Sequence, residues 1–130
     1  MWMRTTTFLY FILALSVLAA GHILSLSFYL YWTYLWLDIP MHFLGGMTVA
    51  LGFLTFFSSY VVRSLRGLAL TLGVVFMVGI AWEVFELVNG LIDIELRPIA
   101  DTALDIVLDL IGGALGYALA RSSSSLDTRP

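Results

Sequence analysis

The sequence predicts an all-α, polytopic membrane protein built as a bundle of four transmembrane helices. Of its 130 residues, 61% are hydrophobic and 12% are charged, whereas soluble domains typically have about 45–50% apolar and about 25% charged residues. The mean hydropathy of +0.99 is too high for a soluble chain of this size, because small domains leave much of their surface in water. Lipid is therefore the expected solvent.

Long runs without charge, residues 5–37 and 39–62, set the first two expected spans. Residues 5–37 contain no Asp, Glu, Lys or Arg, and one helix of that length would measure about 50 Å against a hydrocarbon core of about 30 Å. Only part of the run can cross the membrane, so we expect its aromatic end, residues 28–36, to form an interfacial belt. The four predicted helices cover about 7–27, 40–62, 67–89 and 99–120.

Local signals mark the ends of the later helices. Asn89-Gly90 is typical of a helix C-terminus, and Pro98 is favoured in a first helical turn. The four helices form one transmembrane domain over residues 1–121. We expect the polar tail, residues 122–130, to be disordered and cytoplasmic.

The arginines predict the orientation in a cell membrane. Basic residues favour the cytoplasmic side, and only Arg97 falls on the outer side of the predicted topology. The five on the other side are Arg4, Arg63, Arg66, Arg121 and Arg129. Both termini are therefore expected in the cytoplasm. As an alternative, residues 1–21 resemble a cleaved signal peptide, and cleavage would leave the orientation of the other three helices unchanged.

Ionisable residues form a layer in the outer half of the predicted helices. An Asp near a helix centre costs about 2.5–3.5 kcal/mol to insert, so each such residue is a functional hypothesis. The inner halves of the same helices contain no Asp, Glu or His. The layer consists of His22, His42, Glu83, Glu86, Asp105 and Asp109. This one-sided polarity predicts a pocket that opens to the outside.

Three aspartates lie in one stripe on the fourth predicted helix. Asp101, Asp105 and Asp109 follow one another at intervals of four residues, which places them on one helix face. Like charges in a row repel, so they need either protonation or a counter-charge. The candidates for that counter-charge are Arg97, a protonated histidine or a bound cation.

Two other helices add to this acidic set. Glu83 and Glu86 lie three residues apart on the third helix, and Asp38 and His42 lie four apart near the start of the second. Carboxylates with one or two imidazoles suit Mg²⁺, Mn²⁺, Ca²⁺ or Zn²⁺, and the dominance of carboxylates favours the harder ions. The predicted metal ligands are His42, Glu83, Glu86, Asp105 and Asp109.

Structural roles are alternatives for several of these residues. Asp38 and Asp101 can equally cap helix N-termini, and a lone histidine such as His22 is more often an interhelical hydrogen-bonding group than a ligand.

The chain has no cysteine and no basic tract, which excludes thiolate sites and gives no sign of a nucleic-acid partner. Helix packing rather than phosphate binding is expected of Gly45, Gly46, Gly52, Gly112 and Gly116.

The order of several short motifs is distinctive. They are Asp38 with His42-Phe43, Trp82-Glu83-Val84-Phe85-Glu86, Arg97, and Asp101-x3-Asp105-x3-Asp109 followed by Gly112-Gly113-x2-Gly116. This order resembles that of the VanZ-like membrane proteins and the related YjdF-like family. Glu86 and Asp109 stand where VanZ-like chains have Gln and Asn, and both departures are closer to the YjdF-like form. The resemblance covers residues 38–116 and implies a compact helical membrane domain in which these motifs meet.

The sequence thus predicts a divalent-metal-dependent enzyme that acts on lipid or lipid-linked headgroups in the outer leaflet. The residues expected to carry the chemistry are His42, Glu83 and Asp105, and those expected to meet the headgroup are Arg97, Asp38 and Asp101. The alternative is a non-enzymatic cation or proton carrier, or an envelope protein that binds lipid or a partner. A carrier needs a polar route through the inner halves, which a homo-oligomer would have to build between copies.

Overall fold

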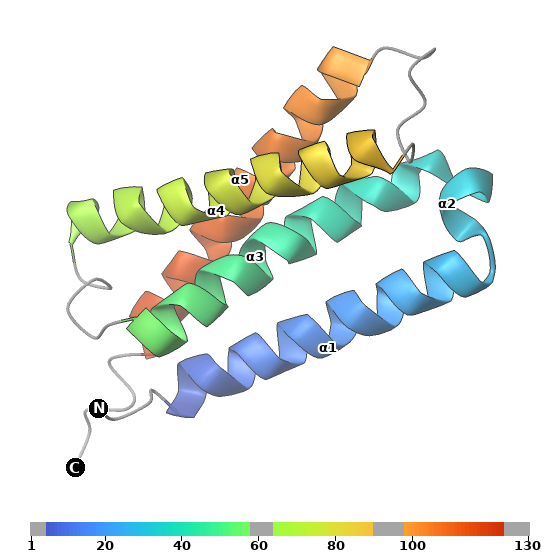
Figure 1. Ribbon diagram of the computed structural model, residues 1–130. Helices are drawn as coiled ribbons and strands as arrows, with labels where there is room; N and C mark the ends of the chain where they lie inside the picture. Colours follow the sequence, from blue (N-terminus) through green and yellow to red (C-terminus); the bar gives the residue numbers. More distant parts are fainter. Residues whose placement is uncertain (1–4, 58–63, 90–97, 124–130) are drawn as a thin grey trace.

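The computed structural model describes residues 5–57, 64–89 and 98–123. The helices in this part of the chain (Figure 1) are α1 (Thr5–Ser27), α2 (Leu30–Thr33), the 3₁₀ helix η1 (Leu35–Leu37), α3 (Asp38–Phe57), α4 (Leu65–Val88) and α5 (Pro98–Ser123). Four segments, namely α1, η1 with α3, α4 and α5, are long and apolar enough to cross a membrane. The chain is therefore an all-α, multi-pass membrane protein, as the sequence predicts.

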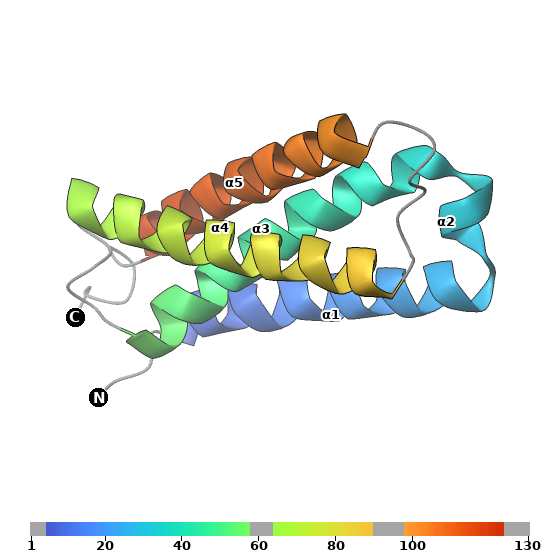
Figure 2. The same cartoon turned by 45° about the horizontal axis from the view of Figure 1, so that its top comes forward.

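Helix α3 lies at the centre of the bundle. It contacts each of the other long helices, most extensively α5, whereas α1 packs mainly against α3. In Figure 2, α1 and α5 lie on opposite sides of α3, with α4 in front. The start of α1 and the end of α5, which are the described residues nearest the chain termini, lie at one end of the bundle, and α2 lies at the other (Figures 1 and 2).

Glycines allow α3 and α5 to approach closely. A Cβ atom added to Gly46 would collide with the main-chain carbonyl of Asp109, and one added to Gly112 would collide with the carbonyl of Phe43. Small residues permit such contacts between membrane helices, where van der Waals packing rather than the hydrophobic effect holds helices together. The packing role predicted for these glycines is confirmed, and it fixes the relative position of the two helices that carry Asp38, Asp105 and Asp109.

Apolar side chains fill the end of the bundle near the chain termini. The hydroxyl of Tyr117 on α5 donates a 2.9 Å hydrogen bond to the main-chain carbonyl of Ser64, just before α4. The buried cluster at this end joins α1, α3 and α5 and contains Ala14, Leu51, Leu54, Tyr117 and Ala120. The described acidic residues of α3, α4 and α5 lie toward the opposite end of the bundle.

The helix boundaries shift by a few residues from the predicted ones. Helix α3 begins at Asp38 rather than at about residue 40, and residues 58–62 of that predicted helix lie outside the described residues. Helix α4 begins at Leu65, because the Ser64 hydroxyl accepts a 3.0 Å hydrogen bond from the Gly67 N–H and so caps the helix.

The polar tail begins later than predicted. Ser122 and Ser123 belong to α5 rather than to a disordered segment. Ser123 is buried. Its hydroxyl lies 2.9 Å from the hydroxyl of Thr7 on α1 and donates a hydrogen bond to the Ala120 carbonyl. The rest of the predicted tail, residues 124–130, lies outside the described residues.

The aromatic segment between α1 and α3, predicted to form an interfacial belt, has helical structure of its own. It contains α2 and η1, and Tyr29 turns the chain into α2 with a left-handed backbone, φ 55°, which is uncommon for a residue other than glycine. Trp32 and Trp36 are 60% and 62% exposed. Exposed rings at the end of the bundle suit the membrane interface.

Candidate metal centre

Three helices meet at the end of the bundle that lies opposite the chain termini. Helices α3 and α5 begin at this end, and α4 ends there (Figure 1). The turns of these helices near this end carry one histidine and five acidic residues. They are Asp38 and His42 on α3, Glu83 and Glu86 on α4, and Asp105 and Asp109 on α5. The packing of α3, α4 and α5 therefore brings residues from distant parts of the chain to one place.

His42 lies at the centre of this cluster and is only 5% exposed. Its Nε2 atom lies 3.6 Å from Asp38 Oδ1, 3.9 Å from Glu83 Oε1 and 4.0 Å from Asp105 Oδ1. On the other side of the ring, Nδ1 lies 3.4 Å from Asp109 Oδ1. Four carboxylates from three helices thus surround one imidazole. When they are ionised, a single imidazolium leaves the cluster with excess negative charge.

Glu83 is a buried carboxylate with one oxygen bonded and the other not. Its Oε2 accepts a 2.7 Å hydrogen bond from the hydroxyl of Thr102 on α5. Its Oε1 faces Nε2 of His42 and has no hydrogen-bond partner among the described residues. Leaving a buried charged acceptor unsatisfied is costly. Among the described residues, this oxygen therefore faces His42 with its acceptor capacity unused.

The distances around Nε2 suit a shared cation better than direct hydrogen bonds. They run from 3.6 to 4.0 Å, and a separation of about 3.6 Å or more is too long for a hydrogen bond. Atoms held about 2.1 Å from a tetrahedral metal stand about 3.4 Å apart. Ligand atoms lie within 4.8 Å of one another in two groups that share the histidine, Asp38 with His42 and Asp105, and His42 with Glu83 and Glu86.

The structure places the residues predicted to bind a headgroup in different surroundings. The Asp38 carboxylate lies beside His42 and belongs to one of the two groups that could hold a metal ion. Asp101 is exposed on the first turn of α5. Arg97 lies outside the described residues. Only the two aspartates can therefore be placed relative to the cluster.

His22 belongs to a separate contact near the mouth of the cluster. Its Nδ1 lies 2.9 Å from the Tyr31 hydroxyl, and its ring meets that of Trp82 edge-on at 6.0 Å. Burial raises the pKa of the Tyr31 phenol, and the charges of Asp38 and Glu86 raise it further. The phenol therefore stays neutral near pH 7. The hydrogen-bonding role weighed for His22 in the sequence fits this geometry.

Two further residues position the cluster, and the sequence alone did not predict this role for them. Thr102 looks like an ordinary membrane-helix threonine, yet its hydroxyl bonds Glu83 across two helices. A Cβ atom added to Gly79 would lie 2.6 Å from Asp109 Oδ2, so glycine leaves the space that this carboxylate occupies. The spacing of four residues between Gly79 and Glu83 is the only signal that links this glycine to the acidic face.

No family model, no curated protein and no solved structure matches this chain. Its functional interpretation therefore rests on the residues and their geometry.

Proposed function

We propose that this membrane protein holds a divalent cation at the His42 cluster and uses it on the phosphate-bearing headgroup of a lipid or lipid-linked molecule in the outer leaflet. The observation that carries the proposal is the position of Glu83 Oε1. This atom is buried, lacks a partner among the described residues and faces Nε2 of His42 at 3.9 Å. A cation between them would bond this oxygen and offset the repulsion among the carboxylates.

The donor atoms narrow the choice of cation. His42 can share an ion either with oxygens of Asp38 and Asp105 or with oxygens of Glu83 and Glu86, because the ligand atoms of each group lie within 4.8 Å of one another. Imidazole is a poor partner for Mg²⁺ and Ca²⁺, which prefer oxygen ligands throughout. Of the four ions that the sequence allows, this mixed set favours Mn²⁺ and Zn²⁺.

The place of the cluster supports a headgroup as substrate. Glu86 and the exposed Asp101 lie one turn nearer than Glu83 and Asp105 to the outer ends of their helices. A divalent cation held in this position would supply electrophilic assistance at a phosphate oxygen. Contact between the phosphate and Arg97 stays a prediction from the sequence. Within this proposal, the predicted catalytic residues His42, Glu83 and Asp105 act by holding and orienting the cation.

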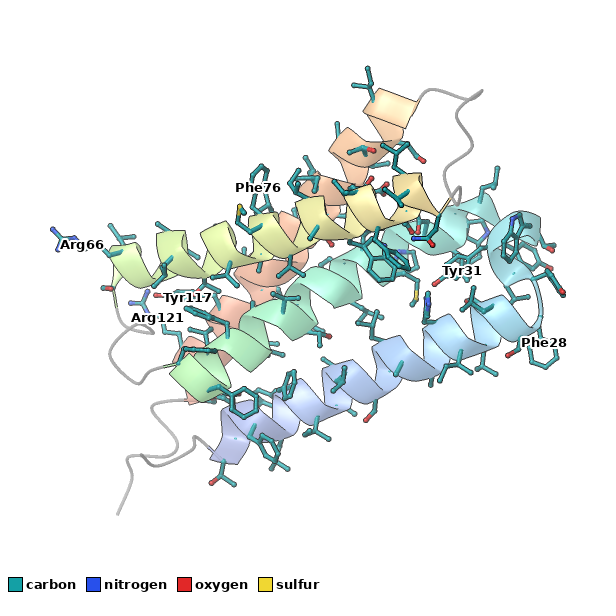
Figure 3. The ribbon with its side chains drawn as sticks, viewed as in Figure 1. Phe28, Tyr31, Arg66, Phe76, Tyr117 and Arg121 are labelled. Carbon is teal, nitrogen blue, oxygen red and sulfur yellow. The ribbon has the colours of Figure 1, made fainter. Side chains whose placement is uncertain are left out.

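The proposed orientation places both termini in the cytoplasm. Figure 3 shows Arg66 and Arg121 at the end of the bundle where Tyr117 lies, away from Tyr31. Arginines at one end support the cytoplasmic location of that end. A reporter fused after Pro130 should be active only as a cytoplasmic fusion, and activity of a periplasm-dependent reporter would contradict the orientation.

The resemblance to VanZ-like and YjdF-like proteins is part of the same proposal. It is supported by the way the motif residues gather, since Asp38, His42, Glu83 and Asp105 come from three helices and meet around one imidazole. Short motifs that were merely in the right order would not need to meet in this way.

The direct test is a metal-dependent assay on lipids. The purified protein in detergent is incubated with phospholipids and with a polyprenyl-diphosphate lipid, after EDTA treatment and after addition of Mn²⁺ or Zn²⁺. We expect release of a headgroup or phosphate only with the metal, and loss of that release in His42→Ala. Gly73→Ala is the matched control, because a Cβ at this position of α4 meets nothing within 4 Å.

Two outcomes would overturn the proposal. Equal release in the presence of EDTA and of metal would rule out a metal-dependent reaction. Metal-dependent cation flux across proteoliposomes without any change in lipid would favour the carrier. The described polar groups at the inner end argue against a carrier, since the buried hydroxyls of Thr55 and Thr71 are bonded to carbonyls of their own helices.

A further inference from the structure

We propose that Asp109 is a positioning residue, which holds the His42 ring so that Nε2 faces the cation, and that it is not itself a ligand. This inference rests on the proposed function and deepens it. It also assigns Asp109 a different role from the one that its place in the aspartate stripe predicted.

The two nitrogens of the His42 ring face different surroundings. Nε2 is near the oxygens of Asp38, Glu83 and Asp105 at 3.6, 3.9 and 4.0 Å. Nδ1 is near Asp109 Oδ1 at 3.4 Å, the shortest of the four separations. Both groups of candidate ligand atoms include His42, and neither includes Asp109. The imidazole therefore lies between the other carboxylates and Asp109.

Asp109 occupies a space that main-chain atoms and glycines define. A Cβ at Gly79 on α4 would lie 2.6 Å from its Oδ2, and a Cβ at Gly45 on α3 would lie 3.8 Å from its Oδ1. Its own carbonyl packs against Gly46, where no side chain fits. The Asp109 residue is 6% exposed. This enclosure leaves the carboxylate facing the imidazole and fixes it there.

The chemistry of imidazole makes this arrangement useful to a metal site. A neutral histidine carries one N–H and one lone pair, and the group bonded to the N–H decides which nitrogen binds the metal. Histidines that bind metals almost always donate their other N–H to a carboxylate, a carbonyl or water. Donation from Nδ1–H to Asp109 directs the Nε2 lone pair at the oxygens of Asp38, Glu83 and Asp105.

The test determines which nitrogen binds and what Asp109 contributes. Full-length protein with isotope-labelled histidine nitrogens is loaded with an NMR-active cadmium isotope, which takes nitrogen and oxygen ligands as Zn²⁺ does. The His22→Gln variant, prepared in parallel, identifies the His42 signals. We expect coupling between the metal and Nε2 of His42. In Asp109→Asn we expect one ion per chain with an affinity about 10–100-fold lower, the usual effect of losing such a carboxylate partner.

A second pair of variants keeps the test independent of the lost charge. Gly79→Ala displaces the Asp109 carboxylate without removing it and should weaken cation binding, whereas Gly73→Ala on the same helix meets nothing within 4 Å and should not. Thermal unfolding of each variant shows whether it is folded.

The outcomes separate this inference from the proposed function. Coupling to Nδ1, unchanged affinity in Asp109→Asn, or a loss of binding in Asp109→Asn as complete as in Asp105→Asn would overturn the positioning role while leaving the metal site in place. A wild-type protein that binds no ion would overturn both. Binding with the expected coupling but without any reaction on lipid would overturn only the enzymatic part.

Discussion

The hydroxyl of Thr102 on α5 donates a 2.7 Å hydrogen bond to Oε2 of Glu83 on α4. This bond joins two helices at the rim of the acidic cluster and fixes the orientation of a buried carboxylate. The remaining oxygen of that carboxylate, Oε1, consequently points at His42 and lacks a partner among the described residues. The Thr102 hydroxyl thus orients the Glu83 oxygen on which the proposed metal site depends.

Removing this hydroxyl should weaken both the fold and the site. In Thr102→Val we expect a loss of about 1 kcal/mol in the free energy of unfolding, because a buried hydrogen bond between helices disappears. Cation affinity should fall about tenfold, since Glu83 is no longer held. Thr102→Ser retains the hydroxyl and should restore most of the affinity. Thermal unfolding and metal titration measure the two effects, and an unchanged affinity in Thr102→Val would show that Glu83 is not a ligand.

The close contact between α3 and α5 should tolerate no added side chain. In Gly112→Ala the new methyl group would collide with the Phe43 carbonyl, so the helices must separate. We expect a destabilisation of at least about 2 kcal/mol from this overpacking. Gly73→Ala makes the same chemical change in open space and should leave the unfolding temperature unchanged or slightly higher. Equal stability of the two variants would show that the crossing is looser than this geometry.

The pair formed by His22 and Tyr31 should matter for stability but not for cation binding. Tyr31→Phe removes the 2.9 Å hydrogen bond to His22 and should cost about 0.6–1 kcal/mol. Its metal affinity should equal that of the wild type, because neither residue belongs to the candidate ligand groups. A large loss of affinity would place this pair in the site.

The same substitution predicts a difference in alkaline stability. The raised pKa of Tyr31 means that the folded protein holds this proton more tightly than the unfolded chain does. The resulting stability is fully present below the unfolded phenol pKa of about 10 and is lost as the pH rises further. Above that pH the wild type should lose stability faster than Tyr31→Phe, as thermal unfolding across the alkaline range would show.

Composition and periodicity were sufficient to predict much of this molecule. Two spans followed from charge-free runs and two from signals at helix ends, and the stripes of acidic residues followed from spacing within each helix. The meeting of Asp38 with His42 and Asp105 depends on how α3 packs against α5, which spacing along one helix cannot give. The bond between Thr102 and Glu83 was equally out of reach, because threonines in membrane helices usually bond their own main chain, as Thr48 does here with the Leu44 carbonyl.

The measurement that tests the central claim most directly compares two aspartates on one face of α5. Asp105 is buried beside His42, and Asp101, one turn earlier, is exposed. Thermal unfolding of the wild type, Asp105→Asn and Asp101→Asn is followed in detergent with EDTA, and again with Mn²⁺ or Zn²⁺ added. A cation at a hundredfold excess over its dissociation constant should stabilise the wild type by about 2.7 kcal/mol.

Asp101→Asn should keep most of this gain, because its carboxylate lies outside both ligand groups. Asp105→Asn should lose the gain and remain folded, since asparagine retains the shape of the side chain. A wild-type protein that no divalent cation stabilises would contradict the metal site, and so would a gain that Asp105→Asn retains in full.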